Sequence, residues 1–192
     1  MARHKEFERE EVLDKAMDLF WRQGYEATSI QDLVSYMGIN RGSIYDTFGD
    51  KHQLFLAALE RYLDNVSQKL QKLENSPTGI AAIREFFLEL LESRTGEKGT
   101  QGCMITNSTV ELILDDPHTA SRIQSQLARM EKAFYQALTR AQAQGEIRPQ
   151  HNLHALARFL VSSAHGSAVI AKTAPQKEVL EDIVNVTLSV LN

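Results

Sequence analysis

The sequence of 192 residues contains one cysteine, four prolines and no apolar run that reaches about 18 residues. The single cysteine, Cys103, cannot form a disulfide within the chain and suits a reducing compartment. The lack of a long apolar run argues against a membrane span, and the charged start of the sequence shows no secretory signal pattern. We therefore expect a soluble cytoplasmic protein with no membrane partner.

The sequence also lacks strand-like alternation, internal repeats and low-complexity tracts. Its apolar residues, 43% of the total, recur at helical spacing, and all four prolines fall at or near expected helix boundaries. These features predict an all-α fold of about nine helices. We expect a three-helix head in residues 1–50, followed by a long fourth helix that leads into a helical body in residues 51–192.

Positive charge is scarce, although it is what most nucleic-acid-binding domains display. The net charge is −4, and the first fifty residues hold six Lys or Arg against ten Asp or Glu. Many of these acids, including Glu10, Asp14 and Asp18, lie on the expected first helix and can face away from a duplex. Specific binding needs local basic groups rather than a basic average. The sequence thus predicts few phosphate contacts and a modest salt dependence if the head binds DNA.

A helix, a sharp turn and a second helix are predicted in residues 28–48, TSIQDLVSYMGINRGSIYDTF. Thr28 and Gln31 have the spacing of a capping box, which marks a helix start. Gly38 stands where a left-handed residue ends that helix, and Asn40 can cap the next one. The first helix has one apolar face, formed by Ile30, Leu33, Val34 and Met37.

The second helix of this pair has an inward side, Ile44 and Phe48, and a free side. The free side carries Arg41, Ser43, Tyr45, Asp46 and Thr47. An arginine can read the O6 and N7 atoms of guanine, and hydroxyls can take base edges or phosphate oxygens. Gly42 permits a close approach of the backbone. A compact helical hairpin with a solvated face remains the alternative interpretation.

The segment GINRGSIYDTFGDKHQLF resembles the recognition-helix region of the TetR family of one-component repressors. The residues that match the family pattern in order and spacing are Gly38, Ile39, Arg41, Gly42, Ser43, Ile44, Tyr45, Phe48, Lys51, Leu54 and Phe55. The preceding segment matches as well, at Ala16, Phe20, Gly24, Tyr25 and Thr28. The resemblance covers about the first third of the chain, and the remainder agrees with the family in length and helical character only.

The resemblance implies a dimeric regulator, most simply a repressor, that binds a palindromic double-stranded operator and is released by a small-molecule effector. The residues expected to face bases are Arg41, Ser43, Asp46 and Thr47, and Gly42 is expected to bind DNA by letting the backbone approach closely. Those expected to hold phosphates are Thr28, Ser29, Tyr45 and Lys51. Two half-sites are expected because one short recognition helix reads too few bases for useful specificity.

The last two helices expected from the sequence are long and apolar, from about residue 152 to 172 and from Pro175 to the C-terminus. They can form an intramolecular core. The resemblance implies instead that they pair with a second copy as a four-helix bundle, and we favour this dimer. The expected contacts are Leu156, Leu160, Ala164, Ala168, Val179, Ile183 and Val186.

A ligand pocket is expected in the body, among aromatic, sulfur-containing and polar residues. Helical spacing alone favours a plain core for these side chains, and the resemblance to ligand-responsive repressors is what implies a pocket. The residues expected to line it are Tyr62, Phe86, Phe87, Cys103, Met104, Asn107, Glu111, Met130, Phe134, Phe159 and His165. The sequence does not name the effector.

Cys103 follows Gly102 in the expected first turn of a helix, where backbone amides can lower the pKa of a thiol. It is either a redox or electrophile sensor, as in some TetR-like proteins, or an inert buried thiol. The second interpretation is favoured because cysteine is most often a small buried hydrophobe.

No metal, cofactor or enzymatic activity is predicted. His151 and His154 are three residues apart, but no carboxylate or cysteine stands at ligand spacing beside them. Phosphate loops, zinc-protease motifs and nucleophile elbows are not found. The alternatives to a DNA-binding regulator are a helical interaction module that has lost specific DNA binding and a helical protein that binds a small molecule.

Overall fold

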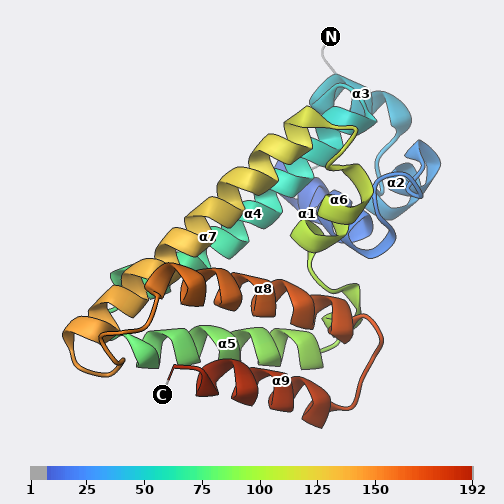
Figure 1. Ribbon diagram of the computed structural model, residues 1–192. Helices are drawn as coiled ribbons and strands as arrows, with labels where there is room; N and C mark the ends of the chain where they lie inside the picture. The colour runs from blue at the N-terminus through green and yellow to red at the C-terminus, as the bar shows by residue number, and fades with distance from the viewer. Residues whose placement is uncertain (1–7, 192) are drawn as a thin grey trace.

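The computed structural model describes residues 8–191, which form nine α-helices, one short 3-10 helix and no strand (Figure 1). The all-α prediction and the N-terminal helix-turn-helix head are thereby confirmed. The elements are α1 (Arg9–Gln23), α2 (Ile30–Met37), α3 (Arg41–Phe48), α4 (Lys51–Asn75), α5 (Ile80–Thr95), η1 (Gly99–Gln101), α6 (Met104–Leu112), α7 (Pro117–Ala143), α8 (Leu153–Ala171) and α9 (Lys177–Ser189).

The start of α2 differs from the expectation by one residue. Ser29, not Thr28, is the N-cap, and it forms a capping box with Asp32 in which each side chain accepts a hydrogen bond from the other residue's backbone N–H. Thr28 is fully buried, and its hydroxyl donates to the carbonyl of Gly24 at 2.6 Å. This bond fixes the turn between α1 and α2, which leaves the capping position to the following serine.

The turn between α2 and α3 forms as predicted. Gly38 adopts the left-handed conformation with φ of 74° and ends α2, because glycine enters this region without steric cost. The Asn40 side chain then caps α3 by accepting a hydrogen bond from the N–H of Ser43 at 2.9 Å. Ile44 is fully buried and Phe48 nearly so. These anchors orient the opposite side of α3 outward.

The two longest helices, α4 and α7, run side by side from the head into the body (Figure 1). The first half of α4 shares a buried cluster with α1–α3 that includes Phe20, Leu33, Phe55 and Leu59. Its second half joins a separate cluster with α5 and α7–α9 that includes Leu70 and Phe134. Helix α4 therefore packs into both cores and links one to the other.

Helix α5 begins later than predicted. Ser76 ends α4 instead of opening α5 with Pro77, and α5 starts at Ile80. The cause is a close approach: a Cβ atom on Gly79 would lie 2.4 Å from Ala141 of α7. The chain crosses α7 at this glycine before the helix can start, and the N–H of Ile80 then donates to the Glu146 carboxylate.

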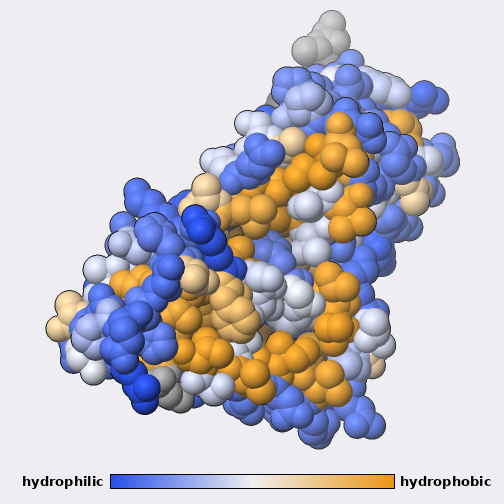
Figure 2. Space-filling model, in the orientation of Figure 1, coloured by the Kyte–Doolittle hydropathy of each residue, from blue (hydrophilic) through white to orange (hydrophobic). Residues whose placement is uncertain are grey.

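Helices α5, α8 and α9 lie roughly parallel to one another below the α4–α7 pair (Figure 1). Figure 2 shows apolar side chains gathered on the face of the body where α8 and α9 lie. The exposed large apolar residues of these two helices are Phe159, Val169, Ile170, Val179 and Val186. Between residues 8 and 191, no helix is long and apolar enough to cross a membrane.

Candidate nucleic-acid interface and body cavity

The outward side of α3 carries Arg41, Gly42, Tyr45 and Asp46, all exposed. The Arg41 side chain donates a hydrogen bond from Nη2 to the Tyr45 hydroxyl at 3.2 Å, and its guanidinium lies 5.5 Å from the centre of the Tyr45 ring. The two side chains therefore form one projecting unit. An arginine held above an aromatic ring keeps most of its donors free for a base edge or a phosphate.

The other residues predicted to contact DNA differ in how exposed their side chains are. Ser29 is exposed, and Lys51 lies with its ammonium 4.3 Å from the centre of the Tyr25 ring. Ser43 is half-buried, and the hydroxyl oxygen of Thr47 is buried without a hydrogen-bond partner among the described residues. The burial of Thr28 contradicts its predicted role as a phosphate ligand, because its hydroxyl is already used within the turn.

Three of the four acidic residues of α1 contact later elements, whereas Glu11 pairs with Lys15 on the same helix. Arg61 of α4 binds Asp14 through Nε at 2.8 Å and Glu10 through Nη1 at 3.1 Å. Asp18 accepts hydrogen bonds from Lys98 and from the Tyr36 hydroxyl. Burial raises the pKa of Asp18, but these bonds lower it more, so that it stays below its ordinary value. Part of the negative charge of the head is thus paired with Arg61 of α4 and Lys98 of the body.

Helix α6 holds the turn that precedes α2. The Glu111 carboxylate accepts hydrogen bonds from the N–H groups of Tyr25 at 3.0 Å and Glu26 at 2.8 Å. A second contact joins His52 to Asp116, the N-cap of α7, at 2.8 Å. Burial raises the pKa of Asp116, yet hydrogen bonds from Thr119 and His52 lower it to about 2. Anionic side chains therefore fix the turn before α2 to α6 and the start of α4 to α7.

A cavity of about 80 Å³ lies in the body, bordered by α1, α4–α8 and the loop before α6. Five of the predicted ligand residues line it: Tyr62, Phe86, Cys103, Met130 and His165. Residues that the sequence analysis missed also line it: Trp21, Val66, Lys69, Leu90, Ser93, Arg94, Gly102, Ile105 and Ala164. The walls are mostly apolar with a few polar groups, as in sites for small molecules.

The structure places the other predicted ligand residues elsewhere. Phe87, Met104 and Phe134 are packed inside the two cores, and Phe159 is exposed on α8. Asn107 donates to the carbonyls of Trp21 and Gln101. Glu111 is occupied by the turn before α2. Six of the predicted residues therefore do not contact the cavity: five have side chains used in packing or in hydrogen bonds elsewhere, and Phe159 faces outward.

Cys103 lies at the N-cap of α6, where the Tyr62 hydroxyl donates to its Sγ atom at 3.6 Å. The Nδ1 atom of neighbouring His165 is hydrogen-bonded to the Thr106 hydroxyl at 2.8 Å. Burial raises the pKa of the Cys103 thiol, but His165, the Thr106 N–H and the Tyr62 hydroxyl together lower it to about 6. A thiol with this pKa is largely ionised at neutral pH. The partly buried position agrees with the inert thiol favoured from the sequence and the low pKa agrees with a sensor, so both interpretations stay predictions.

The predicted dimer contacts divide between the surface and the interior. Val179 and Val186 are 43% and 63% exposed, and Leu156 and Ile183 are partly exposed. Leu160, Ala164 and Ala168 are buried within the chain, and Ala164 borders the cavity, which corrects their prediction as surface contacts. Helix α8 has apolar residues on both its buried and its exposed side, and helical spacing alone does not distinguish the two.

Comparison with known proteins gives matches over most of the chain. The family model described as bacterial regulatory proteins of the tetR family matches residues 12–58, and a tetracyclin repressor-like C-terminal domain matches residues 79–186. The uncharacterized HTH-type transcriptional regulator YezE of Bacillus subtilis is 39% identical over 194 residues and 100% of both chains. The chain belongs to the TetR family.

Other TetR-family proteins are similar over the whole length. The HTH-type transcriptional repressor ComR of Escherichia coli is 35% identical, over 97% of this chain and 90% of ComR. A cysteine mutant of the TetR family regulator CifR, solved with a 26-bp double-strand operator DNA, has a TM-score of 0.86 at 25% identity and 100% coverage of both chains. This TetR-family chain is a DNA-binding transcriptional regulator.

Proposed function

We propose that the protein is a homodimeric repressor that binds a palindromic operator and leaves it when a small molecule occupies the body cavity. In this proposal residues 1–50 bind DNA, and residues 51–192 bind the ligand and dimerise. The observation that carries it is the Arg41–Tyr45 unit, which projects from α3 while Ile44 and Phe48 hold the other side of the helix in the core.

We assign base reading to Arg41, Ser43 and Asp46, with Gly42 allowing a close approach. Asp46 is exposed on the same helix as Arg41 and can accept a hydrogen bond from cytosine N4. Phosphate contacts are assigned to Ser29, Tyr45 and Lys51. Few basic groups take part, so we expect a modest salt dependence of affinity.

The exposed apolar face of α8 and α9 is proposed as the dimer interface. Phe159, Ile170, Val179 and Val186 would otherwise remain in water on adjacent helices, and such patches mark interaction surfaces. Pairing across a twofold axis presents two copies of α3, which matches the symmetry of a palindrome.

Release is proposed to act through α6 as well as α4. Helix α6 begins beside the cavity at Cys103 and ends near Glu111, which holds the turn before α2. A ligand that fits the cavity only when α6 has moved would displace that turn and with it α2 and α3. The ligand must prefer the state that cannot bind DNA, because equal affinity for both states shifts nothing.

Selection of duplexes from a random library by the purified protein tests the proposal. We expect enrichment of an inverted repeat, and native mass spectrometry should find two chains for each duplex. Enrichment of one half-site by single chains would contradict the dimer. Failure to bind any duplex at low salt would contradict operator binding.

A further inference from the structure

We propose that the body cavity binds a small organic monoanion, with a carboxylate on Arg94 and an apolar body against α4, α5 and α6. The inference rests on the proposed function only in taking this cavity as the effector site. It is drawn from the charges, donors and shape of the cavity wall.

Arg94 brings a positive charge into the wall without a carboxylate partner, and the nearby Cys103 thiol, which raises the pKa of Arg94, is not hydrogen-bonded to it. Its guanidinium donates to the Ser167 hydroxyl and, at 2.6 Å, to the carbonyl of Ala164, which are both neutral. No described carboxylate forms an ion pair with it, although arginines 61, 129 and 158 each have one. Burial lowers the pKa of Arg94. A partly buried cation without a counter-ion is costly, and a ligand carboxylate would supply a two-point partner.

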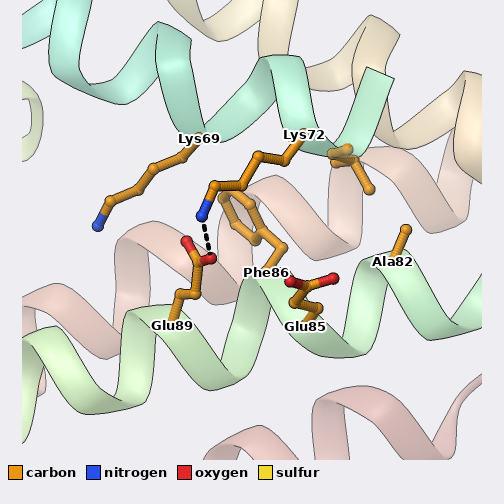
Figure 3. Close-up of a pocket in the computed structure, with 7 residues that line it drawn as sticks. Lys69, Lys72, Ala82, Glu85, Phe86 and Glu89 are labelled. Carbon is orange, nitrogen blue, oxygen red and sulfur yellow. Dashed lines mark hydrogen bonds and ion pairs between the residues drawn. The ribbon is translucent and has the colours of Figure 1, made fainter. Parts of the chain in front are cut away.

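Lys69 adds a second positive charge at the edge of the same cavity. Figure 3 shows the neighbouring groove between α4 and α5, where Lys72 binds Glu89 at 2.6 Å and Lys69 extends separately. Lys69 itself forms no ion pair with the described residues. Glu85 and Glu89 line this groove and not the cavity. The lining of the cavity thus contains two cations and no carboxylate, in a chain where acids outnumber bases.

Trp21 supplies a further donor. Its Nε1–H is buried and has no acceptor among residues 8–191, and the indole borders the cavity against the Tyr62 ring at 5.1 Å between centroids. An indole N–H can only donate. An anionic ligand would satisfy this group together with Arg94, whereas a cationic ligand would face Arg94 and Lys69 with no carboxylate in the lining to offset them.

The remaining wall residues determine which apolar part of a ligand fits the cavity. Val66, Phe86, Leu90 and Ile105 offer apolar surface on three helices. The volume of about 80 Å³ is below the ~150 Å³ of an engineered cavity that holds benzene. The cavity as it stands therefore fits a short-chain acid, and a single-ring acid would have to open it.

Among the residues that line the cavity, Cys103 is the one whose thiolate could pair with Arg94 in place of a ligand carboxylate. Its recorded hydrogen-bond partner is the Tyr62 hydroxyl, and no hydrogen bond joins it to Arg94 in the described chain. If the thiolate were the partner of Arg94, removing it would strengthen carboxylate binding sharply. We expect Cys103→Ser to bind carboxylates as well as the wild-type protein or slightly better.

The single tryptophan makes the test direct, because Trp21 is the only one in the sequence. The full-length protein is titrated with butyrate, hexanoate and benzoate and with the matching amides, while tryptophan fluorescence is recorded. At least one acid should saturate the signal and bind about tenfold more tightly than its amide. Arg94→Gln should abolish the preference for the acid, and Arg94→Lys should weaken it. Arg84→Gln, on the exposed side of α5, should preserve it.

Three results would each overturn the inference. These are no saturable change with any acid, equal affinity for acid and amide, and an unchanged preference in Arg94→Gln. The acid and amide comparison on the wild-type protein decides the matter even if no Arg94 variant folds. Operator selection on the same sample separates the two proposals: DNA binding without acid binding removes only this inference, and acid binding without DNA binding removes the proposed function.

Discussion

The Glu111 carboxylate and the N–H of Tyr25 are joined by a hydrogen bond of 3.0 Å between α6 and the turn before α2. The second carboxylate oxygen accepts from Glu26 at 2.8 Å. Gly24 lies against the same group, since a Cβ atom there would stand 2.9 Å from Glu111 Oε2. A body helix that borders the cavity therefore holds the segment that positions the DNA-binding helices.

Replacing Glu111 with glutamine should loosen this junction. One carboxylate oxygen becomes an NH₂ group, which cannot accept from either backbone N–H, so unfolding free energy should fall by about 1–3 kcal/mol. Urea denaturation followed by circular dichroism measures the change. Glu97→Gln is the control, because Glu97 is an exposed acid outside the junction. Equal stability of both variants would show that the contact contributes nothing.

Arg41→Ala should weaken operator binding by about 1–3 kcal/mol and relax the base preference at one position of each half-site. The reason is the loss of the exposed guanidinium held at Tyr45. Fluorescence anisotropy with the selected operator and its single-base variants measures both effects. Arg84→Ala makes the same chemical change on the body and should bind normally. A uniform loss on every sequence would assign Arg41 to phosphate instead of bases.

Val186→Arg should convert the dimer into monomers. Val186 is 63% exposed on the apolar face of α9, where two charges would meet near the twofold axis and lose their hydration. Analytical ultracentrifugation measures the mass. Val110→Arg is the matched control, because Val110 is 84% exposed on α6 and lies outside the proposed interface. A wild-type monomer, or a dimer that survives Val186→Arg, would exclude this interface.

The alkylation of Cys103 by iodoacetamide should depend on pH with a midpoint near the thiol pKa of about 6. Only the thiolate reacts, so the rate should rise as pH rises through this value and then level off. His165→Ala should move the midpoint upward, because His165 lowers the pKa of the thiol in the folded protein. A wild-type midpoint near the ordinary cysteine value of about 8.5 would contradict the proposed environment.

The head could be predicted closely because local signals determine it. Gly38, Asn40, Ile44 and Phe48 have the predicted roles. The error at Thr28 arose because the spacing of Thr28–Gln31 and Ser29–Asp32 is the same, and only the bond from Thr28 to Gly24 distinguishes them.

The body was harder to predict because its helices are apolar on more than one side. Periodicity finds the apolar positions of α8 but does not say which face meets the chain's own core, so the buried Leu160 and Ala164 were assigned to the surface. The cavity joins six helices that are distant in sequence. One signal was available: Arg94 continues the spacing of Ile83, Phe87 and Leu90, and a charge on an apolar stripe indicates a partly buried site.

Dimethyl sulfate footprinting of the selected operator tests most directly whether two copies of α3 enter the major groove, because the reagent methylates guanine N7 there. We predict protection of guanines in two half-sites about one helical turn apart, roughly 34 Å, and loss of that protection in Arg41→Ala. Full reactivity of every guanine at saturating protein, or protection confined to one half-site, would contradict the account.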